Sequence, residues 1–143
     1  MKVVDLAINA ALGMKESEPG ESHLLELPVS SLSKNHVGSV HASAQFALAE
    51  ACSGQWLCLQ LKGIQDRVFP LLRHSNVKFR KPAQGRLLAF ADPVEGQAHN
   101  LTDTLNTKGR LLVAIQVSVQ DENQQTTMTG QFDWYLQWLP PNE

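Results

Sequence analysis

The chain has 143 residues, of which 43% are hydrophobic and 18% are charged, and its formal net charge is −2 at pH 7. This length suits one domain, expected over residues 1–143, that buries roughly two thirds of its unfolded surface, and the composition argues against disordered, collagen-like and membrane-spanning chains. Basic residues are spread along the chain instead of forming an arm, so we expect neither nucleic acid nor a membrane as a partner.

The first residues predict a short amphipathic helix over 2–13, because apolar residues recur at near-helical spacing and Gly13 stands where helices often end. Lys2 is the only basic residue in this segment apart from the chain terminus, and Asp5 and Asn9 interrupt the apolar stretch. A cleavable secretory signal is therefore not expected.

The two cysteines, Cys52 and Cys58, lie in an apolar segment without a CxxC pair. They lack the second thiol pair that would complete a zinc site, so we expect reduced core cysteines, as in the cytoplasm. No metal or redox cofactor is expected.

A long helix is predicted over about 41–58, where the sequence HASAQFALAEACSGQWLC contains no proline and is rich in alanine. Its apolar residues cover nearly the whole circumference, which is typical of a helix surrounded by protein. A polar loop over 16–22 and a first strand over Leu24–Val29 precede it.

Four further strands are predicted after this helix, in segments rich in branched and aromatic residues. They span Val68–Phe79, Arg86–Ala91, Leu111–Val119 and Thr126–Trp138. Residues 81–85 are expected to connect two strands and 121–124 to form a hairpin turn, while Ala98, Leu101 and Leu105 suit a short surface helix. One buried helix followed by a run of strands predicts an α+β domain whose antiparallel sheet curls round the helix.

Candidate chemistry gathers at the start of the long helix. Asn35 is followed by His41 and, nine positions later, by Glu50. This order resembles the hotdog-fold thioesterases of the phenylacetyl-CoA thioesterase type, which have an Asn, an HGG-like turn opening a central helix, and an acidic residue nine positions after the His. The two glycines of that turn are Ala42 and Ser43 here, and the acid is Glu where Asp is common in the family.

A second motif, NVKFRKPAQG over 76–85, resembles the strand and Pro-Ala-x-Gly turn of the same family. The resemblance covers roughly residues 24–135 and implies the hotdog fold, an antiparallel sheet wrapped around a long central helix. Lys78, Arg80 and Lys81 suit contacts with the phosphates of coenzyme A, or equally a solvated strand face.

The resemblance implies hydrolysis of an acyl-CoA thioester, with coenzyme A arriving as part of the substrate. The backbone N–H of Ala42 would bind the developing oxyanion, helped by the helix dipole. Glu50 would act as general base or nucleophile, Asn35 would position the water or the carbonyl, and His41 would shape the turn.

The helical spacing of these residues predicts an oligomer. If both residues are helical, His41 and Glu50 lie about 13.5 Å apart along the axis and project from opposite sides. They cannot meet on one water within a single chain. We therefore expect a homo-oligomer, a dimer or a dimer of dimers, with active sites between subunits.

Plainer explanations stand beside these roles. Taken alone, Asn35 is explained as a turn residue, and His36 is explained as a structural histidine. Glu50 is harder to explain in this way, because a carboxylate among apolar residues is costly to desolvate unless it is paired or functional. The alternation of Phe132, Trp134, Leu136 and Trp138 indicates core and interface packing more than a substrate site.

Two rival functions remain open. His36 and Glu50 are fourteen positions apart, a spacing that resembles the His and Glu of hotdog hydroxyacyl dehydratases, although those enzymes carry prolines between the two that are absent here. The other rival is a non-catalytic acyl-CoA or lipid-binding module, favoured by the Ala42 and Ser43 substitutions.

Overall fold

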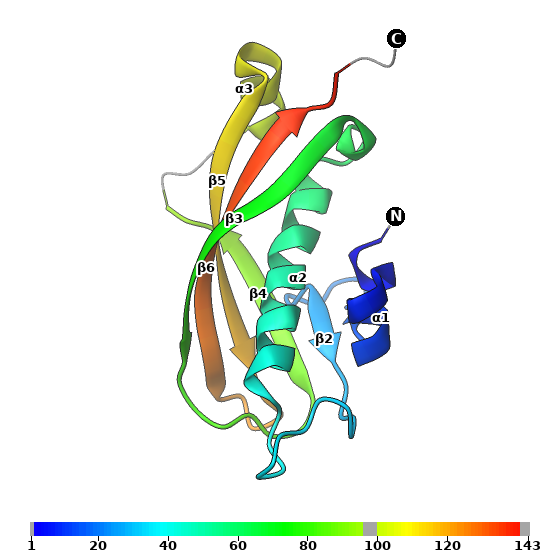
Figure 1. Cartoon of the computed structure of the whole chain (residues 1–143), viewed down its shortest axis with the longest axis vertical. Coiled ribbons are helices and arrows are strands. Elements are labelled where there is room, and N and C mark those ends of the chain that lie inside the picture. The colour runs from blue at the N-terminus through cyan, green and yellow to red at the C-terminus, as the bar shows by residue number, and fades with distance from the viewer. Residues whose placement is uncertain (1, 96–99, 141–143) are drawn as a thin grey trace.

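A six-stranded antiparallel sheet curves round one long helix (Figure 1). The structure is a computed structural model and describes residues 2–95 and 100–140. Its strands are β1 (Lys15–Glu16), β2 (Leu25–Leu27), β3 (Val68–Phe79), β4 (Leu87–Pro93), β5 (Arg110–Gln120) and β6 (Thr126–Trp138), in the spatial order β1-β2-β4-β5-β6-β3. The predicted α+β class, with an antiparallel sheet wrapped around a central helix, is confirmed.

The central strands bury one face by simple alternation. Along β5, Val113, Ile115 and Val117 are buried, and β6 buries Phe132 and Leu136 opposite them. Because side chains of a strand point to alternate faces, this pattern places one continuous apolar surface against the helix. The bounds of β3 and β6 agree with the predicted ranges, whereas β2 is shorter than predicted and β1 was not predicted.

The long helix α2 spans Ala42–Gln60, close to the predicted 41–58. It contacts β2, β4, β5 and β6, and its buried residues include Ala44, Leu48, Ala49 and Cys52. The small alanines allow the sheet to approach closely. Both cysteines are free, as expected, but only Cys52 is fully buried, while Cys58 is half-buried.

The amino-terminal segment corrects the prediction of one helix over 2–13. A 3-10 turn, η1 (Val3–Asp5), and a short helix, α1 (Ala7–Leu12), are separated by Leu6, whose backbone is extended (φ −60°, ψ 137°). The buried side chain of Asn9 donates through Nδ2 to the Val3 carbonyl oxygen at 2.9 Å, taking an acceptor that a continuous helix would use for its own backbone. Gly13 ends α1 in the left-handed region, as predicted.

The remaining elements are small. The turn η2 (Gln65–Arg67) leads into β3, and the predicted surface helix appears as α3 (Leu101–Lys108) with Leu101 and Leu105 buried. Ala98, assigned to the same helix, lies outside the described residues. Residues 81–85 and 121–124 form loops, as expected. In the described part of the chain, no helix has the length and apolar character needed to cross a membrane.

Candidate active site

The turn that leads into α2 is tied to the connection between β3 and β4. The Val40 N–H donates to the Ala83 carbonyl oxygen at 2.9 Å, and the His41 N–H donates to the Ser33 carbonyl oxygen at 2.7 Å. Ala83 is fully buried beneath this junction. The two sequence motifs, 35–50 and 76–85, therefore meet at the start of α2.

Asn35 organises this turn. Its Oδ1 accepts from the backbone N–H groups of Val37 (3.1 Å) and Ser39 (3.0 Å), and its Nδ2 donates to Ser39 Oγ at 2.8 Å. The side chain thus makes local contacts typical of a turn-forming asparagine. The plainer explanation for Asn35 matches this geometry, and contact with a water or a thioester remains a prediction.

His41 is the N-cap of α2 and is not itself helical, with φ −62° and ψ 140°. Its Nδ1 accepts from the Ser43 N–H at 3.0 Å and lies 2.5 Å from Ser43 Oγ. Because a backbone N–H can only donate, Nδ1 must present a lone pair, and a neutral ring then carries its proton on Nε2. His41 therefore caps the start of α2 through Nδ1, and the role in the active site that the resemblance implied for it stays a prediction.

Ala42 is the first residue of α2 and is exposed. Within residues 2–95 and 100–140 its backbone N–H has no hydrogen-bond acceptor, as is usual for the first groups of a helix. Neither Ala42 nor Ser43 has a positive φ, so this turn does not require glycine at either position. The Ala42 N–H is therefore available as a donor, although Ala42 and Ser43 stand where the similar thioesterases have two glycines.

Glu50 lies midway along α2 with its carboxylate half-buried. Within the described residues that carboxylate has no hydrogen-bond or salt-bridge partner, and burial raises its pKa above the ordinary value of 4.5. Eight residues separate Glu50 from Ala42, which is about 12 Å of helix rise. A single thioester carbonyl therefore cannot reach both groups of one chain.

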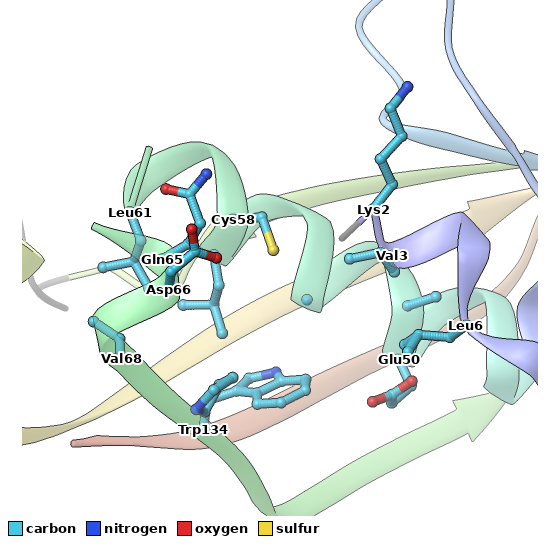
Figure 2. A pocket seen from close by; sticks show the side chains of 14 residues that line it. Lys2, Val3, Leu6, Glu50, Cys58, Leu61, Gln65, Asp66, Val68 and Trp134 are labelled. Atoms are coloured by element: carbon cyan, nitrogen blue, oxygen red, sulfur yellow. The ribbon is translucent and has the colours of Figure 1, made fainter. Parts of the chain in front are cut away.

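Glu50 borders a cavity of about 380 Å³ (Figure 2). Its lining residues come from η1, α2, η2, β3 and β6, and they are mostly apolar: Lys2, Val3, Leu6, Glu50, Ala51, Gly54, Leu57, Cys58, Leu61, Gln65, Asp66, Val68, Pro70 and Trp134. Concave, mainly apolar sites with a few polar groups are typical of small-molecule binding.

Trp134 forms one wall of this cavity, whereas its alternation with Phe132 and Leu136 in the sequence indicated core and interface packing. Its Nε1 donates to Ser53 Oγ at 2.9 Å, and Ser53 Oγ donates to the Glu50 carbonyl oxygen at 2.7 Å. Phe132 and Leu136, two positions to either side on β6, are completely buried in the core. Alternation alone does not distinguish a core residue from a neighbour on the same face that borders a cavity.

The basic residues lie apart from this cavity. Lys78 is exposed on β3, and Arg80 and Lys81 are exposed in the connection beside the start of α2. The Arg80 Nε donates to Thr129 Oγ1 at 2.9 Å. The structure thus brings two of these basic residues near the helix start, and none of the three borders the cavity at Glu50.

Cys58 borders the cavity but is poorly suited to act as a nucleophile. Burial raises the pKa of its thiol, and burial together with the charge of Asp92 raises the pKa of Cys52 to about 12. Both thiols are therefore protonated at neutral pH. No cluster of three or more metal-binding side chains occurs among the residues that the structure describes.

Comparison with known proteins identifies the fold. A Pseudomonas aeruginosa protein of unknown function, described as a probable thioesterase, is 22% identical with a TM-score of 0.79, over 96% of this chain and 91% of that one. A Haemophilus influenzae thioesterase is 16% identical with a TM-score of 0.73, and the match covers 99% of this chain and 90% of that one. A Bacillus halodurans protein solved with CoA is 19% identical with a TM-score of 0.69, and the match covers 90% of this chain and 74% of that one.

No curated protein matches the chain. A family model described as a domain of unknown function, DUF4442, matches residues 10–136, which is most of the chain. The chain therefore has the hotdog fold and belongs to the DUF4442 family.

Proposed function

We propose that this protein hydrolyses acyl-CoA thioesters at sites formed between two copies of the chain. The observation that carries the proposal is Glu50, a half-buried carboxylate that has no partner within the described residues and borders an apolar cavity. Ala42, at the start of the same helix, offers a backbone N–H of the kind that stabilises an oxyanion.

The reaction follows from these two groups. Glu50 accepts a proton from a water molecule as the water oxygen attacks the thioester carbonyl carbon. The carbonyl oxygen becomes negatively charged and binds the Ala42 N–H of the other chain. The intermediate collapses with cleavage of the C–S bond, and the sulfur of coenzyme A takes the proton from Glu50. The raised pKa of Glu50 makes its carboxylate a stronger base than an ordinary glutamate.

The comparisons support this chemistry. The similar structures include proteins described as thioesterases and one solved with CoA. In a Staphylococcus aureus thioesterase among them, a glutamine and a glutamate fifteen positions apart have been replaced by alanine in separate variants. Asn35 and Glu50 have the same spacing and the same pairing of an amide with a glutamate.

The other motif offers coenzyme A a basic surface. The connection that carries Arg80 and Lys81 is held against the start of α2 by the hydrogen bond from Val40 to Ala83. With Lys78 on the adjacent end of β3, these side chains supply three positive charges for its phosphates. We place the protein in the cytoplasm, where acyl-CoA is available and both cysteines stay reduced.

A non-catalytic acyl-CoA-binding module is the second candidate. One observation favours it: the side chain of Asn35 and the Nδ1 of His41 are both engaged in local contacts, which leaves fewer groups to orient a water. A dehydratase is less well supported, because His36 is exposed on the turn and does not border the cavity at Glu50.

The test is hydrolysis of short, long and aromatic acyl-CoA thioesters, followed with a thiol-trapping dye. We expect turnover by the wild type and none by Glu50→Gln. If Glu50→Gln hydrolyses as fast as the wild type, the catalytic assignment is wrong. If several thioesters bind and none is cleaved by the wild type, the protein is a binding module.

A second variant, Ala42→Pro, removes a single N–H. Proline is well accepted at the first position of a helix, and His41 has the extended backbone that a residue before proline requires. Loss of one oxyanion donor should lower kcat about 10²–10³-fold. Ala7→Pro is the matched control, because Ala7 begins α1 after a similarly extended Leu6 and does not border the cavity.

A further inference from the structure

The cavity follows the axis of α2. Its helical wall consists of residues spaced three, four and seven positions apart, which lie on one face of a helix: Glu50, Ala51, Gly54, Leu57, Cys58 and Leu61. Figure 2 shows Glu50 near Val3 and Leu6 at one end, Leu61, Gln65, Asp66 and Val68 at the other, and Trp134 between them. The only carboxylate of α2 therefore stands at one end of a long apolar wall.

Length and volume give the same estimate of what fills this cavity. From Glu50 to Leu61 the helix rises about 16 Å. An extended hydrocarbon advances about 1.3 Å per carbon, given a C–C bond of about 1.5 Å, so about a dozen carbons span that length. A methylene occupies nearly the volume of a water molecule, roughly 30 Å³, so about a dozen also fill the 380 Å³ cavity. The cavity is therefore about one chain wide.

The cavity has walls on either side of its axis. The Trp134 indole is fixed by its hydrogen bond to Ser53, and Gly54 lies against it: a Cβ built on Gly54 would be 3.7 Å from Trp134 Cζ2. On the other side, Val3 of η1 borders the cavity, and the neighbouring Lys2 forms an exposed ion pair with Glu16 at 3.1 Å. A glycine at position 54 leaves the middle of the cavity open.

We propose that this cavity binds an unbranched acyl chain of up to about twelve carbons, with the thioester at Glu50 and the chain running along α2 toward Leu61. The proposal rests on the proposed function and specifies its substrate class. Gly54 and Trp134 set the width of the site. Gln65 and Asp66 lie at the far end and are at least partly exposed, so a longer chain would extend into solvent.

The test uses S-alkyl-CoA thioethers, which cannot be hydrolysed, with chains from methyl to hexadecyl and a 2-phenylethyl compound for comparison. Binding is measured by calorimetry on the wild type. Each added methylene should increase affinity about fourfold, from about 0.8 kcal/mol per buried CH₂, until about twelve carbons, after which affinity should stay constant. The 2-phenylethyl compound should bind more weakly than n-octyl, which has the same number of carbons.

Two variants locate the chain along the helix. Gly54→Leu blocks the cavity about 6 Å from Glu50, and Cys58→Phe blocks it about 12 Å from Glu50. In Gly54→Leu, affinity should stop increasing with alkyl chain length at about half the number of carbons that limits the wild type. In Cys58→Phe, this limit should lie between those of Gly54→Leu and the wild type. Leu59→Phe is the matched control, because Leu59 is exposed on the same helix and does not border the cavity. Retained binding of S-methyl-CoA verifies that each variant is folded.

The outcomes separate the two proposals. Affinity that does not depend on chain length, stronger binding of the aromatic compound, or an equal effect of all three variants overturns the linear-chain assignment, even if thioesters are hydrolysed. A length limit that moves with the position of the block supports it, even if the wild type hydrolyses no thioester. In that case only the proposed hydrolysis is rejected.

Discussion

Burial of Glu50 lowers the stability of the fold when the carboxylate is ionised, and the same ionised carboxylate is the proposed base. Its pKa in the folded protein is raised by burial, so between 4.5 and the folded pKa the native state binds more protons than the unfolded state. Stability therefore falls as pH rises through that window, and above the folded pKa the ionised carboxylate destabilises the fold relative to a freely solvated glutamate. A group retained at such a cost is a good candidate for function.

Replacing Glu50 with Gln should accordingly stabilise the protein at neutral pH while abolishing turnover. Urea unfolding of both proteins across a pH series would measure the difference in free energy of unfolding. We expect no pH-dependent change in that difference well below pH 4.5, an advantage for Glu50→Gln that grows as pH rises from 4.5 to the folded pKa, and a constant difference above it. A wild type that is more stable than the variant at neutral pH would mean that Glu50 has a partner when it is ionised.

His41 should contribute to stability as a helix cap. Its Nδ1 accepts the Ser43 N–H, which is the role that Asn, Asp, Ser and Thr side chains usually take at this position. His41→Ala should therefore lower the free energy of unfolding by about 1 kcal/mol, and His41→Asn should restore most of it. Chemical denaturation of the three proteins checks this. Equal losses in both variants would show that the ring contributes through packing, not through the cap.

At the scale of elements, the spacing of hydrophobic residues predicts the bounds of a strand or helix well where one face, or the whole surface, of that element is buried. β3 and β6 match their predicted ranges, and α2 differs from its prediction by one residue at the start and two at the end. The break at Leu6 was missed because it depends on a hydrogen bond from Asn9 to Val3, which has no signature in hydrophobic spacing. The two-residue strand β1 was missed because it is too short to show alternation.

The site was predictable only in part. The order of Asn35, His41 and Glu50 located the start of α2 and its carboxylate, because local motifs are visible in one stretch of sequence. The cavity was not predictable, because its walls come from η1, α2, η2, β3 and β6 and depend on how these elements pack. Trp134 lies 84 positions after Glu50, and nothing in its local sequence indicates that the two border one cavity.

Two glycines in helical regions should respond in opposite directions to alanine. Gly54 lies inside α2, and a Cβ at this position would make ordinary contact with Trp134 at 3.7 Å, so Gly54→Ala should add about 0.5–1 kcal/mol of stability. Gly109 ends α3 at φ +73°, so Gly109→Ala should cost about 1 kcal/mol. Urea midpoints measure both. A loss of stability in Gly54→Ala would show that the helix and indole cannot accommodate a methyl group.

For the molecule as a whole, the β3 edge of the sheet is the surface where the proposed second copy would bind. β3 pairs with β6 on one side, and within the described residues no strand covers its other side. Phe69, Leu71 and Phe79 on this strand are 45–50% exposed. An uncovered edge with large apolar side chains favours association, and two copies related by a twofold axis would cover it in both chains at once.

Heterodimers give a decisive test of sites shared between chains. If Glu50 of one chain works with Ala42 of the other, a purified heterodimer of Glu50→Gln with Ala42→Pro keeps one intact site and should have about half the wild-type activity per dimer. A heterodimer of the wild type with a chain carrying both substitutions should be inactive, because each of its sites lacks one group.

The two heterodimers contain the same substitutions and differ only in how these are distributed between the chains, so differences in folding or expression cannot mimic the result. They are prepared by co-expressing two differently tagged chains and purifying through both tags. If each site instead lies within a single chain, the pattern reverses: the first heterodimer is inactive and the second keeps half the activity. Because Ala42 and Glu50 are about 12 Å apart along one rigid helix, we expect the first pattern.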